Sequence, residues 1–157
     1  MGSTLTVDNI VGATTAGNIH IPGHVVQVQQ FYKAATLAVT VNSSSMTASG
    51  YQKAITPKYA DSLIIVHASI SMAYAAGWGE ARMHMNGVIM PGGANYHMGY
   101  TDNNHNNYGP LVFQGQHQAT STNTLTFEPY YRSDGSNNYT VSHSNASIGI
   151  TLMEIAQ

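Results

Sequence analysis

Residues 139–157 read Tyr-Thr-Val-Ser-His-Ser-Asn-Ala-Ser-Ile-Gly-Ile-Thr-Leu-Met-Glu-Ile-Ala-Gln, a polar turn that runs into an apolar strand. Successive side chains of a strand point to opposite faces, so the strand presents two sets of side chains. Both sets hold apolar residues: Ile148, Ile150, Leu152 and Glu154 in one, Gly149, Thr151, Met153 and Ile155 in the other. The pattern predicts a central strand that packs on the domain core with one face and on a sister subunit with the other. Because the sequence stops two residues after Ile155, we expect little tail beyond it.

Further strands are predicted wherever apolar or alternating runs lie between polar turns. Residues 63–72 begin as a continuous apolar run and then alternate, which predicts burial on both faces first and on one face later. Residues 82–90 predict a hairpin, because Asn86-Gly87 favours a type I′ turn. The other predicted strands span 25–32, 35–41, 111–120, 124–131 and 147–155. No segment shows the apolar face of a helix, so we expect an all-β sandwich or barrel.

Charge is scarce in this chain of 157 residues. Lys and Arg total 5 and Asp and Glu total 7, so charged residues make up 8% of the sequence, against about 25% in ordinary domains. The five cations are scattered and the net charge is −2, which argues against nucleic-acid binding. The longest apolar-leaning run, residues 63–74, is too short to span a bilayer, so no membrane insertion is expected. The absence of cysteine excludes disulfides and thiolate metal sites.

Two segments differ from the rest of the sequence. Residues 1–24 carry isolated apolar side chains too sparse to build a core, and Pro22-Gly23 separates them from the strand predicted at 25–32. We interpret residues 1–24 as an extended arm for attachment and trimerisation, and residues 25–157 as one β-sandwich domain. The side chains expected to attach the arm to other proteins are Leu5, Val7, Ile10 and Val11.

The second segment lies between Pro91 and Pro110 and has no apolar period, so a long functional loop is expected there. It is rich in Tyr, Asn and His, the side chains of adaptable contact surfaces. Aromatic rings stack on sugar faces and amides hydrogen-bond sugar hydroxyls, which favours a glycan ligand. The predicted ligand-binding residues are Trp78, Tyr96, Tyr100, Asn104 and Tyr108.

Enzyme activity is not expected. The sequence lacks the Gly-x-Ser-x-Gly, His-Glu-x-x-His and Gly-x-x-x-x-Gly-Lys motifs, and its seven carboxylates are far apart along the chain. No cofactor is expected either. Eight histidines leave one open alternative, since a histidine on a trimer axis would supply three imidazoles to a metal. The candidates for that position are His20, His24, His67 and His84, and ordinary core or surface histidines are the competing interpretation.

Four stretches resemble a known class of proteins: LTVDNIVGATTAG (5–17), IPGHVVQ (21–27), SLIIV (62–66) and ITLMEI (150–155). They are similar to small fibre-like or decoration proteins in the virions of tailed phages, of the cyanophage and marine-phage type. The resemblance implies a jelly-roll sandwich like that of tumour necrosis factor or the complement globular head, preceded by an arm. It also implies a homotrimer in the virion, on the tail or capsid surface, whose residues 1–24 contact other virion proteins.

The resemblance implies one of two functions. In one, the protein is a fibre or head-fibre protein that attaches the particle to a polysaccharide of the host surface. In the other, it is a capsid decoration or cement protein, or a tail adaptor, without a receptor-binding role. A depolymerase is a third hypothesis, disfavoured because glycoside hydrolysis needs a close pair of carboxylates.

Overall fold

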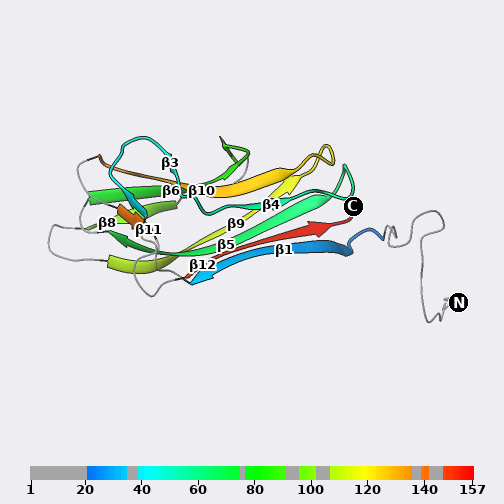
Figure 1. The fold of residues 1–157 in the computed structure, drawn as a ribbon, viewed down its shortest axis with the longest axis horizontal. Coiled ribbons are helices and arrows are strands. Elements are labelled where there is room, and N and C mark those ends of the chain that lie inside the picture. The colour runs from blue at the N-terminus through cyan, green and yellow to red at the C-terminus, as the bar shows by residue number, and fades with distance from the viewer. Residues whose placement is uncertain are drawn as a thin grey trace, which may run out of the picture.

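The computed structural model of the protein describes residues 21–34, 39–74, 77–90, 96–101, 107–135, 139–141 and 147–157. These residues form strands in two antiparallel sheets, which lie one above the other in Figure 1. The all-β prediction is therefore confirmed, and the two sheets agree with a β-sandwich. The described residues include no helix, and so no helix that could cross a membrane.

The first sheet, sheet A, is built around β5. Its strands are β1 (Val25–Ala34), β2 (Val39–Val41), β5 (Leu63–Tyr74), β9 (Asn107–Gln118), β11 (Tyr139–Val141) and β12 (Ser147–Ile155). Strand β9 pairs with β5 along one edge, while β12 and β11 pair with successive parts of the other edge. Strands β1 and β2 pair in turn with β12 and β11. If two strands that occupy the same position in the sheet are counted as one row, the rows of sheet A are, in order, β1/β2, β11/β12, β5 and β9.

The second sheet, sheet B, is built around β10. Its strands are β3 (Thr47–Ala48), β4 (Lys53–Ile55), β6 (Gly77–Met85), β7 (Val88–Ile89), β8 (Tyr96–Thr101) and β10 (Leu125–Ser133). Strands β3 and β4 pair with one edge of β10, and β6 pairs with the other. The far edge of β6 carries β7 and β8. The rows of sheet B are therefore β3/β4, β10, β6 and β7/β8.

The core fills the space between the two sheets. Alternate residues of β12 are buried, as the sequence pattern predicted, and alternate residues of β10 and of the first part of β5 follow the same rule. The largest fully buried apolar side chains include Tyr131, Phe127, Ile64, Ile70 and Ile150. Burying each contributes about 1.5–3 kcal/mol. Gly115 on β9 leaves room for this packing, since a Cβ there would lie 3.0 Å from Cε of Met90.

The sandwich has two distinct ends. Residues 21–24 join β1 at the entry end, where Val25 pairs with Ile155 and Gly23 N–H donates to the carbonyl of Ala156 (2.7 Å). The far end holds the opposite ends of the strands, where Tyr74 of β5 pairs with the beginning of β9. Only two residues join β5 to β6, so β6 begins at the far end too. In Figure 1 the C-terminus and the start of β1 lie together on the right, and β8 and β11 lie on the left.

Most predicted strands are present. The strands predicted at 25–32, 63–72, 111–120, 124–131 and 147–155 correspond to β1, β5, β9, β10 and β12. The Asn86-Gly87 turn is confirmed, since φ is 51° at Asn86 and 79° at Gly87 and the turn joins β6 to β7. Of the strand predicted at 35–41, residues 39–41 form β2 and residues 35–38 lie outside the described part.

Two predictions are wrong. The stretch between Pro91 and Pro110 is not one long loop, because it contains β8 and the first residues of β9. An edge strand is held by backbone pairing, here to β6, and needs no apolar period to form. The start of β5 is not buried on both faces, since Ile65 is 38% exposed while Ile64 and Val66 are buried. Sheet A has one face on the core, and the other face is open in the single chain.

Candidate functional site

The structure places the backbone of four of the five predicted ligand-binding residues. Trp78 lies in β6, Tyr96 and Tyr100 lie in β8, and Tyr108 lies in β9. Trp78 sits in a bulge between two pairs of β6 with β8, and Tyr108 pairs with Ala73 of β5. Asn104 lies outside the described residues, as do the side chains of the other four.

These positions gather toward one end of the molecule. Thr101, next to Tyr100, pairs with Gly77 where β6 begins, and Tyr108 lies one residue from the start of β9. Trp78, Tyr100 and Tyr108 are thus at the far end of the sandwich, and they come from both sheets. Tyr96 pairs with Ala81, further toward the entry end. In Figure 1, β8 and the start of β9 lie opposite the point where residues 21–24 enter.

The histidines proposed for a trimer axis lie in separate places. His24 is exposed at the entry end, beside Ala156. His84 lies on sheet B and is 7% exposed, with Nδ1 3.1 Å from the carbonyl oxygen of Gly87 and its ring stacked on Tyr130 at 3.8 Å. This position serves the packing of sheet B. The described ranges contain no group of three potential metal ligands, and the residues that lie outside those ranges include His20, Leu5, Val7, Ile10 and Val11.

A polar cluster lies on the face of sheet B that points away from the core. Glu80 is fully buried, and its carboxylate accepts hydrogen bonds from Nε of Arg82 and from Nε of Arg132 (2.6 Å). Arg132 reaches Glu80 across the pair β6–β10, in which the two residues are direct partners. Burial alone would raise the pKa of the Glu80 carboxyl, but the hydrogen bonds and charges of both arginines outweigh it and lower that pKa.

This cluster has a structural role. Both oxygens of Glu80 are occupied by guanidinium groups, so the carboxylate cannot act as a base. Glu128, which pairs with His84, accepts a hydrogen bond from the backbone N–H of Gly50 (2.7 Å) and so ties the segment after β3 to β10. The cluster therefore joins β6, β10 and a neighbouring turn.

A second buried carboxylate lies at the entry end. Glu154 of β12 is fully buried and accepts hydrogen bonds through Oε1 from Ser62 Oγ (2.6 Å) and from two backbone N–H groups. Those groups belong to Lys58 (2.7 Å) and Tyr59 (3.2 Å), and Gln27 Nε2 donates to Oε2 (2.6 Å). Glu154 thus holds the segment between β4 and β5 against the last strand. The sequence pattern placed it in an apolar set, so its partners were missed.

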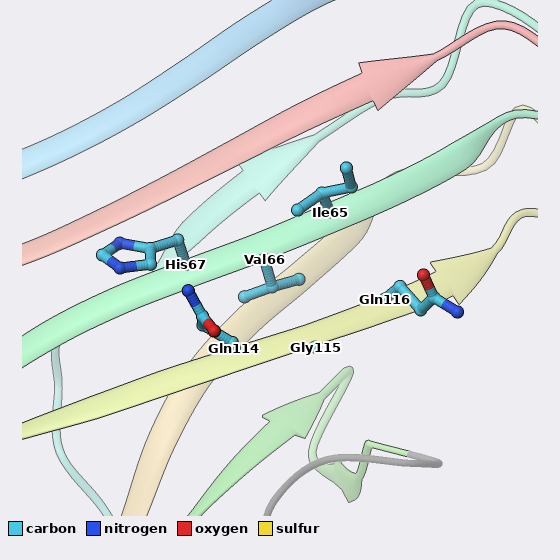
Figure 2. A pocket seen from close by; sticks show the side chains of 6 residues that line it. All are labelled: Ile65, Val66, His67, Gln114, Gly115 and Gln116. Atoms are coloured by element: carbon cyan, nitrogen blue, oxygen red, sulfur yellow. The ribbon is translucent and has the colours of Figure 1, made fainter. Parts of the chain in front are cut away.

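The outward face of sheet A carries a shallow hollow of about 360 Å³ between β5 and β9. Figure 2 shows the side chains that line it, with Ile65 and His67 on β5 and Gln114 and Gln116 on β9. His67 and Gln114 are direct partners across the two strands. The hollow offers amide, imidazole and methyl groups without a charged side chain, which suits a contact surface better than a catalytic site. The alternation of Gln114, Gln116 and Gln118 was a signal for it in the sequence.

Comparison with models of protein families finds no match to this chain, and comparison with curated proteins finds none either. The fold and the placement of the side chains therefore carry the functional argument.

Proposed function

We propose that this chain is a structural protein of a tailed-phage virion, a trimeric fibre or head-fibre protein that attaches the particle to a polysaccharide of the host surface. The observation that supports the proposal best is that the two ends of the sandwich differ. Residues 21–24 enter at one end, and the backbone positions of Trp78, Tyr100 and Tyr108 lie at the other end. An attachment protein needs this arrangement, because the anchored end and the receptor-binding end must face opposite ways.

The order of the rows supports a jelly roll over residues 25–157. If the rows are numbered along the chain, sheet A has the order 1, 8, 3, 6 and sheet B the order 2, 7, 4, 5. Successive rows then wrap around the core as in the double Greek key of jelly rolls, a fold common in viral capsid and lectin domains. Residues 1–24 are the arm in this proposal, and they contact other virion proteins through Leu5, Val7, Ile10 and Val11.

Replacing Tyr96, Tyr100 and Tyr108 together by alanine should weaken binding to bacterial surface polysaccharide. Each aromatic contact contributes about 0.5–1.5 kcal/mol beyond its buried area, so three contribute about 3 kcal/mol, roughly 100-fold in affinity. The measurement is binding of the purified full chain to an array of bacterial surface polysaccharides and to whole cells of aquatic bacteria.

A matched control changes the opposite end of the sandwich. Ser121, Thr122 and Asn123 lie between β9 and β10 at the entry end, and their replacement by alanine should leave glycan binding unchanged. Equal binding of the tyrosine variant and the wild-type protein would contradict receptor binding at the far end. If an antibody against this chain nevertheless labelled intact particles, the protein would be a decoration or adaptor protein without a receptor-binding role.

Removing residues 1–20 should abolish incorporation into virions and leave the domain folded. The truncation spares Gly23 and His24, whose backbone groups hydrogen-bond Ala156 (2.7 and 2.9 Å), so sheet A keeps its pairing at the entry end. The measurements are the melting temperature of the purified variant and its amount in particles assembled from tagged protein. Full incorporation of a truncated chain would refute the role assigned to Leu5, Val7, Ile10 and Val11.

A further inference from the structure

The outward face of sheet A, here called the outer A face, consists of side chains that alternate with buried ones. It comprises the odd-numbered residues of 65–69 in β5 and 149–155 in β12, and the even-numbered residues of 28–32 in β1 and 112–118 in β9. The strand register aligns these residues across four neighbouring rows, so they form one continuous surface.

The outer A face carries several large apolar side chains that stay exposed. Large apolar side chains that stay exposed include Val28 (46%), Tyr32 (72%), Ile65 (38%) and Val112 (39%), all on this face and spread over three strands. Met153 on the fourth strand is half-buried among them. By register, Val28, Met153 and Ile65 are cross-strand neighbours, and Tyr32 and Val112 lie on the other side of a polar row formed by Gln30, Thr151, His67 and Gln114. Exposed apolar side chains gathered on one face among polar groups are typical of a contact surface.

This face carries none of the described charged side chains. The other outward face, on sheet B, holds Glu80, Arg82, Glu128 and Arg132. The remaining described charges lie elsewhere: Lys33 packs over the ring of Tyr51, Glu154 is buried, and Lys53, Lys58, Asp61 and Asp134 lie in β4 and in connecting segments. Depletion of charge at the centre of a surface is the compositional mark of protein interfaces.

The polar groups of the outer A face complement themselves. Gln30, Gln114 and Gln116 each carry an amide, which donates and accepts hydrogen bonds. Around the threefold axis of a trimer the same residues of the three copies meet, so a patch of one charge sign there would repel its copies, whereas amides and methyl groups can pair with theirs. The chemistry of the face therefore points to a second copy of this chain rather than to a charged partner.

We propose that copies of this chain associate through the outer A face, with the hollow beside His67 filled by a side chain of the neighbouring copy. This inference rests on the trimer of the proposed function and assigns its interface. It also explains why Ile65 of β5 and Met153 and Ile155 of β12 are apolar yet partly exposed in the single chain.

The test is the molar mass of the full chain in solution, measured by light scattering during gel filtration over a range of concentrations. Ile65→Lys should weaken association by about 100-fold or more, because it brings like charges together in the interface. Val88→Lys is the matched control, since Val88 is 70% exposed in the β6–β7 hairpin of sheet B and should keep the wild-type mass. Circular dichroism verifies that both variants are folded.

If Ile65→Lys associated at the same concentration as the wild-type chain, the copies would not associate through this face, and the proposal would be overturned. A wild-type chain that stays monomeric would overturn it as well. These readouts need neither particle nor polysaccharide, so a failed adsorption experiment would refute the proposed function and leave the interface standing.

Discussion

Glu154→Ala is expected to lower the free energy of unfolding by about 4 kcal/mol or more. The substitution removes the acceptor of four donors, namely Gln27 Nε2, Ser62 Oγ and the backbone N–H groups of Lys58 and Tyr59. Ser62 is fully buried and the other three donors are partly buried, and Gln27 Nε2 keeps a second acceptor in the carbonyl of Thr56, so each lost hydrogen bond costs about 1–3 kcal/mol, with Gln27 at the low end. A domain of this size has about 5–15 kcal/mol of stability, so the loss is a large fraction of the total. Chemical denaturation at one fixed protein concentration measures it, because association would also shift the midpoint.

Glu128→Ala is the matched control for this experiment. Glu128 is half-buried and has one backbone partner, Gly50, so its removal should cost about 1 kcal/mol. Glu154→Gln keeps the shape and one acceptor oxygen but turns a donor group toward other donors, so an intermediate loss is expected. If Glu154→Ala cost no more than Glu128→Ala, the entry end would not depend on this carboxylate.

Glu80→Ala is expected to cost about 3 kcal/mol. Removing one partner of a buried ion pair leaves the other charges without compensation, which costs about 3–5 kcal/mol when all partners are buried. The lower figure applies because the side chains of Arg82 and Arg132 are 25% and 33% exposed and can recover part of their hydration. The measurement is again denaturation at neutral pH, where the wild-type carboxylate is charged.

The pH dependence of stability provides the check on this interpretation. The pKa of Glu80 is lower in the folded protein than its ordinary value, so the unfolded chain binds the proton more readily. The contribution of Glu80 is therefore complete above about pH 4.3 and is lost as the pH falls through the folded-state pKa. Glu80→Gln should flatten the stability curve in that acidic range. An unchanged slope below about pH 4.3 would show that the arginines do not stabilise the charged form.

Local patterns predicted much of the fold. The alternation of residues 147–155 corresponds to the buried and half-buried faces of β12, and Asn86-Gly87 forms the predicted turn. Sequence reasoning missed β8, because an edge strand is stabilised by its neighbour's backbone more than by its own apolar side chains. The short strands β3 and β4 were missed for the same reason, since both pair only with the edge of β10.

The side-chain clusters could not be predicted in the same way. Glu154 finds its partners more than ninety positions earlier in the chain, and Arg132 meets Glu80 across 52 positions. Which side chains share the outer A face also depends on register: Ile65 joins Gln116 only because β5 and β9 pair at that offset. A shift of one residue would send every side chain of β9 to the opposite face. Tertiary pairing, rather than local pattern, determines these sites.

The position of β12 between β1 and β5 has a consequence for synthesis. Strand β1, the first described strand, is joined to sheet A only through β12. Ile150 of β12 pairs with Phe31 of β1 on one side and with Ala68 of β5 on the other. While the ribosome is still making residues 147–155, β1 and β5 each have an unpaired edge, and the core facing them is incomplete. The growing chain is therefore exposed to aggregation until β12 emerges, and a nonsense mutation before Ser147 should yield no native domain.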